Sequence, residues 1–360
     1  MDNERLYWLA FSAFKGIGPK RFALLRDYFG SAKKAWEKGE EELLAIGLGP
    51  KLTSELVKFR QEFDPSSSFL RLREKEIDCY FLDDNRYPES LKKIDNPPFV
   101  LYVKGSITPQ DDLAIAVVGT RRMTGYGGQV TESLVTELVG AGLTIVSGLA
   151  RGIDSMAHRT ALKAGGRTIG VLASGLDIIY PPENASLVKE IINGQGAVIS
   201  EFPLGSQPMP GSFPARNRII SGLALGTVVV EAPERSGALI TARLAGEQGR
   251  EVFAIPGPVT SPNAAGPAHL IKMGAKLVFK VEDILEELGM KTEMEARKPV
   301  KAENPEEEAV LGLIEKEAKN FDEIVRETGF DSGKVASIIS LLEIKGKVRN
   351  LGNMLYSINQ

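Results

Sequence analysis

The sequence predicts an α/β protein in which a parallel-sheet domain lies between an N-terminal helical unit and a C-terminal winged helix. From about residue 111 to 289, short apolar segments alternate with helical stretches, a pattern typical of βαβ units. Residues 5–63 have apolar side chains at helical spacing, and residues 306–358 read as three helices followed by a hairpin.

Composition limits the classes of protein that the chain can represent. A length of 360 residues exceeds one typical domain, and 43% hydrophobic with 25% charged residues is ordinary for a globular protein. The net charge of -3 offers nucleic acid no global attraction, so any polyanion site must be a local patch. A single cysteine, no signal-peptide pattern, no membrane-spanning run and no Cys/His cluster predict a cytoplasmic protein without a metal.

The predicted N-terminal domain, residues 1–63, is a helix-hairpin-helix or SAM-like helical unit. Its two Gly-Pro-Lys breaks, Gly16–Lys20 and Gly47–Lys51, resemble hairpins whose N–H groups hold a DNA phosphate. They are equally compatible with plain helix connections in a small adaptor. Asp64–Ser68 is predicted to be a linker.

The second predicted domain, residues 69–289, has its core at 111–289. It opens with two expected strands, CYFLD at 79–83 and FVLYVKG at 99–105. The segment Leu113–Thr120 then predicts a buried strand, with a helix over about 126–139. Right-handed crossovers place the carboxyl ends of all parallel strands on one rim, where such sheets bind ligands.

The residues expected along this rim are small, polar, aromatic or positively charged. They are Gly119, Thr120, Arg121 and Arg122 after the first strand, Ser147, Gly148 and Arg151 after the second, Gly175 after the third, Phe213, Arg216, Asn217 and Arg218 in the loop after the fourth, and Ser236 and Gly237 after the fifth. Small residues permit close backbone approach, and helix starts with arginines favour anions. The rim therefore predicts a phosphate-binding surface, although the first of these turns could also be a plain turn with solvated charges.

The spacing of the glycines indicates which classes of phosphate ligand this rim can bind. The glycines at 119, 125, 127 and 128 do not fit the dinucleotide fingerprint, and no Gly-Lys pair precedes Ser or Thr as a Walker loop requires. We therefore expect no nucleotide cofactor. Several arginines with one aromatic residue, Phe213, suit single-stranded nucleic acid, although this ring could also belong to the core.

A Lys/Glu-rich linker is predicted at 291–305, followed by a winged helix at 306–360. Its third helix should start at the N-cap Asp331, and its hairpin should turn at Gly352-Asn353. The face of that helix offers little positive charge beyond Lys334 and Lys345. Partner binding or packing is therefore as compatible with this unit as DNA binding.

The motifs of the central domain resemble those of a known family. The stretches VVGTRRMTGYG, VSGLARGIDSMAH, FPARNRIISGL and VVVEAPERSGALITARLAGEQGREVFAIPG are closely similar to those of the bacterial DNA-processing protein A family, DprA, also called Smf. This resemblance implies an extended Rossmann-like domain that binds single-stranded DNA without strong sequence preference. It further implies a homodimer that loads the RecA recombinase on incoming DNA during natural transformation.

The resemblance also suggests individual roles. Arg121 would contact phosphate, and Phe213 would lie by a base with Arg216 and Arg218 beside it. One position departs from the family pattern, since Pro210 stands where many relatives have a lysine. A phosphate contact is missing there, unless a nearby arginine supplies it.

Two other functions stay open at this point. The rim also resembles that of nucleotide phosphoribohydrolases, but their catalytic glutamate corresponds to Ile240 or Thr241. Glu201 and Glu231 could substitute for this glutamate, but these two residues are better explained as caps of turns or as partners that orient arginines. We therefore expect that the protein is not an enzyme. The alternative is a duplex-DNA regulator that uses the winged helix. His158 is expected to be structural, because no partner for catalysis is placed near it.

Overall fold

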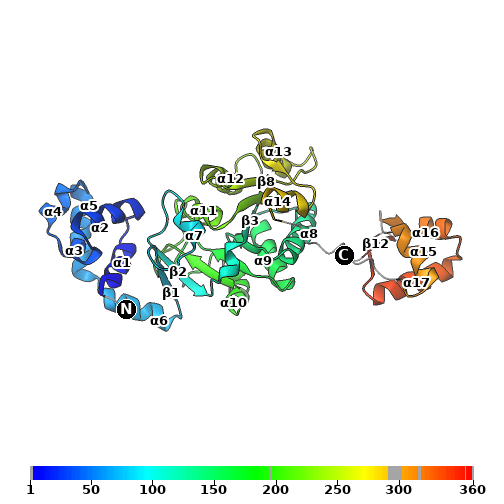
Figure 1. The fold of residues 1–360 in the computed structure, drawn as a ribbon, viewed down its shortest axis with the longest axis horizontal. Helices are drawn as coiled ribbons and strands as arrows, with labels where there is room; N and C mark the ends of the chain where they lie inside the picture. The colour runs from blue at the N-terminus through cyan, green and yellow to red at the C-terminus, as the bar shows by residue number, and fades with distance from the viewer. Residues whose placement is uncertain (1–2, 195, 291–301, 315–317, 353, 359–360) are drawn as a thin grey trace. The chain divides into compact units, whose positions relative to one another are not determined.

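The computed structural model describes residues 3–194, 196–290, 302–314, 318–352 and 354–358 (Figure 1). The chain forms two compact units, Met1–Thr292 and Glu293–Gln360. Among the described residues, no helix is both long enough and apolar enough to cross a membrane.

The N-terminal segment is helical, as predicted. Its helices are α1 (Asn3–Ala13), α2 (Pro19–Phe29), α3 (Ala32–Glu37), α4 (Glu40–Ala45), α5 (Pro50–Glu62) and α6 (Pro65–Glu74). The linker prediction for Asp64–Ser68 is wrong, because these residues begin α6. The Asp64 carboxylate accepts hydrogen bonds from the N–H groups of Ser66 at 3.0 Å and Ser67 at 3.1 Å, and Pro65 occupies a first-turn position that favours proline.

These helices share a core with the neighbouring sheet. The Trp8 ring is only 2% exposed and lies edge-on to Phe22 in α2, with 4.7 Å between ring centroids, and to Phe81, at 5.8 Å. Arg5 in α1 forms an ion pair with Asp84 at 3.0 Å. The predicted domain of residues 1–63 is thus part of the same compact unit as the sheet.

One nine-stranded sheet runs through this unit in the order β1-β2-β6-β5-β4-β3-β7-β8-β9. Its strands are β1 (Asp78–Phe81), β2 (Val100–Gly105), β3 (Ala114–Val118), β4 (Thr144–Ser147), β5 (Thr168–Val171), β6 (Gly196–Ser200), β7 (Gly226–Val229), β8 (Glu251–Ala254) and β9 (Lys276–Leu277). In this spatial order, every neighbouring pair from β6 through β3 to β9 is parallel, which confirms the predicted parallel sheet. The structure adds an antiparallel edge, because β2 pairs with β6 and β1 pairs with β2.

Helices cover both faces of the sheet (Figure 1). Ile115 and Val117 of β3 face the first layer, while Ala116 and Val118 face the second, as the period of two for a strand requires. The first layer consists of α8 (Gly125–Gly140), α9 (Ile153–Lys163) and α14 (Val281–Glu287), and the second of α7 (Glu89–Lys92), α11 (Ser212–Leu223) and α12 (Gly237–Glu247). Beside them lie α10 (Ala185–Ile192), α13 (Ala265–Lys272) and the short turns η1 (Pro109–Asp112), η2 (Pro182–Asn184) and η3 (Pro262–Ala264).

The strand order reverses at β3. The chain winds from β3 through β4 and β5 to β6 on one side, then returns to place β7 against the other side of β3. Ligands of such sheets bind outside the carboxyl ends of the strands near this reversal. A ligand site is therefore expected at the residues that follow β3, β4 and β5.

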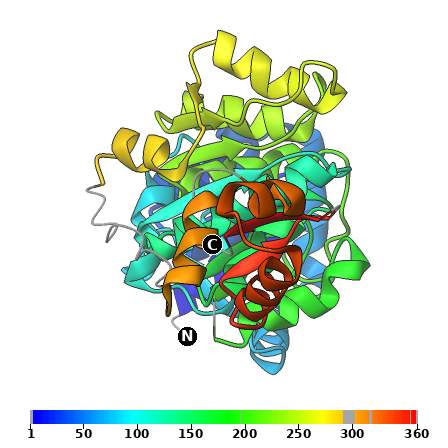
Figure 2. The same ribbon diagram turned by 90° about the vertical axis from the view of Figure 1, so that its right-hand side faces the viewer.

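The second unit has the predicted order of a winged helix (Figure 2). Its elements are α15 (Pro305–Ile314), β10 (Lys319–Asn320), α16 (Phe321–Thr328), α17 (Ser332–Ile344), β11 (Val348–Asn350) and β12 (Leu355–Ile358). The Asp331 carboxylate accepts a hydrogen bond from Lys334 N–H at 3.0 Å, which confirms the predicted N-cap. Residues 291–301 of the predicted linker, and Asn353 of the predicted turn, lie outside the described residues.

Candidate nucleic-acid interface

A small recess of about 30 Å³, which we call the rim recess, lies at the carboxyl edge of the sheet. Its lining comes from the segments that follow β3, β4, β5 and β6, and consists of Arg121, Gly148, Ala150, Arg151, Ala173, Ser174, Tyr180, Pro181, Pro208, Phe213 and Arg216. Five residues that the sequence predicted for the site are among them: Arg121, Gly148, Arg151, Phe213 and Arg216. Segments far apart in the chain thus meet where the crossover rule places them.

Arg121 and Phe213 form the mouth of the rim recess. The guanidinium carbon of Arg121 lies 5.3 Å from the centroid of the Phe213 ring, within the range of a cation–π contact. Arg121 is exposed and, among the residues the structure describes, has no carboxylate partner. A free guanidinium beside an aromatic ring offers one group for a phosphate and one for a base.

The backbone that carries Arg121 is fixed on both sides. Thr120 donates its N–H to the Glu231 carbonyl oxygen at 2.7 Å, and its own carbonyl accepts from Ile153 N–H at 3.2 Å. A side chain at Gly119 would place its Cβ 2.5 Å from a side-chain carbon of Ile153, so only glycine fits there. The Arg121 side chain therefore projects from a rigid turn.

Glu231 belongs to this turn and not to the rim recess. Its buried carboxylate accepts hydrogen bonds from the Thr124 N–H at 2.9 Å and the Thr124 hydroxyl at 2.6 Å. The same hydroxyl accepts from Gly127 N–H at 3.1 Å and caps α8. This confirms the interpretation of Glu231 as a turn-capping residue.

Arg216 does not stand on the surface of the rim, as the sequence suggested, but beneath it. The sequence predicts a loop for the segment FPARNR, whereas its residues form the first turns of α11. Arg216 therefore faces the sheet, is 5% exposed, and donates to the carbonyl oxygens of Gly148 and Val171. Burial lowers the pKa of Arg216 to about 10, while the nearby Asp154 carboxylate opposes this shift.

Asp154 and His158 complete the buried layer under the recess. The Asp154 carboxylate accepts from the N–H groups of Gly148 at 3.1 Å and Ala150 at 3.4 Å; burial raises its pKa and Arg216 lowers it. His158 is fully buried, with its Nδ1 atom 2.6 Å from the Thr168 hydroxyl. Burial, and secondarily Arg216, lowers the pKa of His158 to about 3, which fits the predicted structural role.

Several predicted site residues lie outside the lining of the rim recess. These are Gly119, Thr120, Arg122, Ser147, Gly175, Asn217, Arg218, Ser236 and Gly237. Arg218 instead forms an ion pair with Glu201 at 2.6 Å and lines a larger groove of about 1030 Å³ beside the N-terminal helices. Glu201 thus orients an arginine, as predicted. Ser236 caps α12 through Leu239 N–H at 3.4 Å, and the Asn217 amide donates to the Gly237 carbonyl oxygen at 3.2 Å.

Five residues of this lining were not predicted from the sequence: Ala150, Ala173, Tyr180, Pro181 and Pro208. Tyr180 is the most consequential of them, because it is aromatic and 43% exposed. It follows β5 by several residues, so a rule that considers only the first positions after each strand does not reach it. An exposed tyrosine in a loop after a parallel strand was the available signal.

Similarity to known proteins shows the family of this chain. Residues 78–289 match the family model described as DNA recombination-mediator protein A, and residues 294–354 match the DprA winged helix domain. The chain belongs to the DNA recombination-mediator protein A family. Among its DprA relatives, the Bacillus subtilis DNA processing protein DprA is 48% identical over 217 residues, which span 60% of this chain and 73% of the relative. Protein Smf of Synechocystis is 35% identical, and the match spans 99% of both chains.

Two solved DprA structures share the fold. DprA from Streptococcus pneumoniae is 36% identical, with a TM-score of 0.68 over 80% of this chain and 98% of that one. DprA from Helicobacter pylori is 32% identical, with a TM-score of 0.53 over 59% of this chain and 95% of that one, and it was described for its single-stranded DNA binding mode. The predicted family and fold class are thereby confirmed.

The substitution Arg216→Ala should lower the free energy of unfolding by about 2–4 kcal/mol, because it leaves the buried carbonyl oxygens of Gly148 and Val171 without their donor and removes a positive charge near the buried Asp154 carboxylate. Urea unfolding followed by circular dichroism measures this loss. Arg235→Ala, at an exposed arginine, is the matched control and should change stability by less than about 0.5 kcal/mol. Equal stability of the two variants would contradict a structural role for Arg216.

Replacing His158 by Gln should change how stability depends on pH. The folded protein keeps His158 neutral because its pKa is about 3, whereas the unfolded chain takes up a proton below about pH 6.5. As the pH falls below that value, the wild type should lose stability relative to H158Q by up to about 1.4 kcal/mol per pH unit. Unfolding free energies measured at several pH values test this, and parallel profiles would contradict it.

Proposed function

We propose that the chain binds single-stranded DNA at the rim recess, without strong sequence preference, and acts by binding and not by catalysis. The observation that carries this proposal is the Arg121 guanidinium lying 5.3 Å from the Phe213 ring centroid at an open mouth. A phosphate can replace the ring as the partner of Arg121, and a base can then take the place of the guanidinium on the ring.

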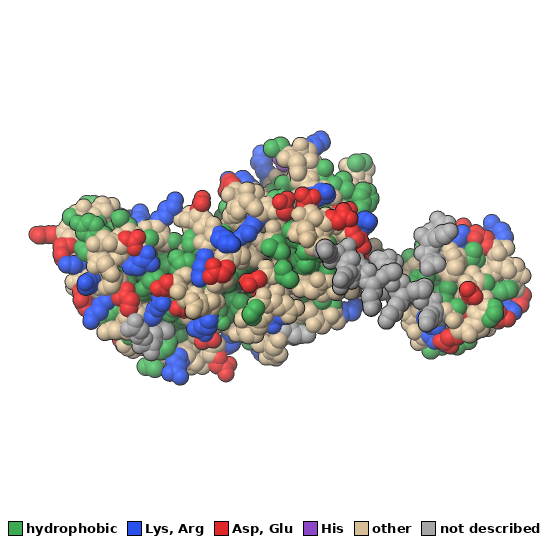
Figure 3. Space-filling view, in the orientation of Figure 1, with side chains coloured by type: hydrophobic (Ala, Val, Ile, Leu, Met, Phe, Trp, Pro, Cys, Tyr) green, Lys and Arg blue, Asp and Glu red, His purple; other side chains and the backbone are tan. Residues whose placement is uncertain are grey.

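The charge distribution supports a local site. The face drawn in Figure 3 has positive and negative side chains interspersed, in keeping with a net charge of -3. Near the rim recess, Arg121 and Arg122 are exposed and have no carboxylate partner within the described residues. Two adjacent free cations at a strand end attract a polyanion where the whole surface does not.

The family supports the wider role. The H. pylori relative was described for its single-stranded DNA binding mode, and five of the residues expected to bind DNA here line the rim recess. We propose further that the chain is cytoplasmic, forms a homodimer, and loads the RecA recombinase on incoming DNA during natural transformation. Pro210 is exposed and supplies no cation, and Arg151 in the lining of the rim recess is the candidate for a further phosphate contact. Arg151 is paired with Glu183 at the surface, where a phosphate can compete for it.

The chemistry of the recess counts against the phosphoribohydrolase alternative. Among the described residues, no carboxylate lines the rim recess. Glu201 is paired with Arg218, Glu231 is bound by Thr124, and the Thr241 hydroxyl donates to the Gly237 carbonyl oxygen at 3.2 Å. Acid–base chemistry needs a titratable group at the bond to be broken. Release of adenine from AMP by the pure protein would support the enzyme instead.

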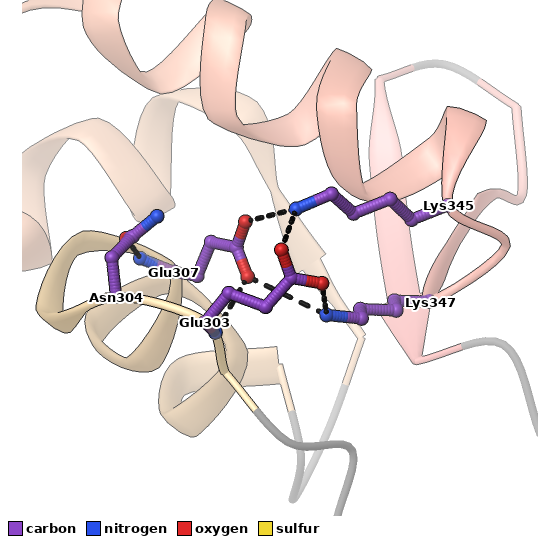
Figure 4. A network of polar contacts seen from close by, with 5 residues as sticks. All are labelled: Glu303, Asn304, Glu307, Lys345 and Lys347. Atoms are coloured by element: carbon purple, nitrogen blue, oxygen red, sulfur yellow. Dashed lines mark hydrogen bonds and ion pairs between the residues drawn. The ribbon is translucent and has the colours of Figure 1, made fainter.

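The charges of the winged helix weigh against the duplex-DNA alternative. Lys345, which follows α17, binds Glu303 and Glu307, each at 2.7 Å, and Lys347 binds Glu303 at 2.8 Å (Figure 4). Lys334 is paired with Glu306 at 2.7 Å. Each of these lysines has a carboxylate beside it, so this surface carries little net positive charge to attract a duplex, whereas Arg121 and Arg122, unpaired in the described part of the chain, add positive charge near the rim recess.

Arg121→Ala should weaken binding of single-stranded DNA to a similar extent for every sequence, because the lost contact is to phosphate. The slope of log K against log salt should flatten by about 0.7, the value for one contact to a single strand. Fluorescence anisotropy with labelled oligo-dT across a salt series measures both effects. The control is Arg243→Ala, an exposed arginine outside the recess lining that is paired with Glu247. Unchanged affinity in R121A would refute the site.

A chain that ends at Thr292 should keep its affinity for single-stranded DNA, because the rim recess lies wholly within the first unit. Gel shifts with single-stranded and duplex DNA, on the full chain and the truncated one, make the comparison. If the protein were a duplex-DNA regulator, truncation would abolish its DNA binding.

A further inference from the structure

Tyr180 is an aromatic residue of the rim recess to which the proposed function assigns no role. Tyr180 is 43% exposed, and its ring lies 5.9 Å from the Phe213 ring, centroid to centroid, with the two planes tilted by 58°. Both rings line the rim recess together with Arg121 and Arg151. Exposed apolar surface costs free energy unless a ligand covers it. Two adjacent rings that line one recess with two guanidinium groups therefore form a surface suited to a ligand.

The loop that carries Tyr180 is held in place before and after the ring. Before it, the Ser174 hydroxyl donates to the Ile178 carbonyl oxygen at 2.7 Å, and Ile178 N–H donates to the Gly175 carbonyl oxygen at 2.9 Å. After it, the buried Asn184 amide donates to the Leu149 carbonyl oxygen at 2.8 Å. An exposed ring on a fixed loop is preorganised for binding, because little ordering remains to be done.

We propose that Tyr180 stacks on a second base of the bound strand, next to the base on Phe213, so that the rim recess holds two successive nucleotides. This inference rests on the proposed function. A recess of about 30 Å³ has room for no more than a few water molecules, so a base cannot enter it and must lie on the rings at its mouth. Arg121 and Arg151 line the same recess, so the proposal assigns the strand's phosphates to them.

Anisotropy titrations with labelled oligo-dT at fixed salt test the proposal. Tyr180→Ala should weaken binding roughly 5- to 150-fold, the loss expected for one stacked base, and should leave the salt slope unchanged. Tyr180→Phe keeps the ring and should bind like the wild type. The matched control is Tyr28→Ala, which removes a tyrosine that is 65% exposed in α2 and lies outside the recess lining.

An oligonucleotide built entirely of abasic sites separates stacking from other effects. The wild type and Y180A should bind it equally, because it offers no base to stack. A deficit of Y180A on this probe would overturn the proposal, as would equal binding of oligo-dT by Y180A and the wild type. Weak binding by Y180F would also overturn it, since the hydroxyl would then be the contact. Failure of the wild type itself to bind oligo-dT would refute the proposed function instead.

Tyr180→Trp provides a readout that does not depend on the stability of the alanine variant. The two native tryptophans, Trp8 and Trp36, lie in the N-terminal helices and give a constant background. Oligo-dT should quench the new fluorescence if a base stacks on residue 180, and the abasic probe should not. Binding of oligo-dT without any quenching would overturn the proposal.

Discussion

A buried guanidinium holds the rim recess together. Arg216 reaches from α11 over the carboxyl ends of β4 and β5 and donates to the carbonyl oxygens of Gly148 and Val171. A charge removed from water needs compensation, which these oxygens and the Asp154 carboxylate provide. Because Asp154 also accepts from the N–H groups of Gly148 and Ala150, the same pair fixes the loop after β4. The floor of the recess is therefore rigid before any ligand arrives.

Two arginines of one recess thus have separate functions. Arg216 is buried and supports the backbone, whereas Arg121 is exposed and free to bind. Their positive charges also act on each other, since Arg121 lowers the pKa of Arg216. A phosphate placed near Arg121 would relieve this repulsion, and the low dielectric around Arg216 would strengthen the attraction. The buried arginine can therefore favour an anion that it does not touch.

The sequence predicts the strands and the rim well, because apolar segments and crossover handedness depend on local pattern. It does not predict which way the residues after β6 face. The Pro-rich segment before Arg216 reads as a loop, yet Pro214 fits the first turn of α11, where its missing N–H costs nothing. The position of Tyr180 likewise depends on Asn184 reaching Leu149, a contact between loops that no local pattern encodes. Residues 64–68 show the same ambiguity, since Asp-Pro-Ser suits both a linker and an N-cap.

The sequence independence that we propose follows from the groups that the rim recess offers to a strand. Contacts to phosphate carry no sequence information, and every base has a face that can stack. Reading a base edge would require free donors and acceptors around a cavity that admits the edge. The recess is too small at about 30 Å³, and two of its polar side chains already have partners: the Ser174 hydroxyl donates to Ile178, and Arg216 donates to Gly148 and Val171. The Arg121 guanidinium and the rings of Phe213 and Tyr180 remain as its contact groups, and they suit the chemistry common to all unpaired nucleotides.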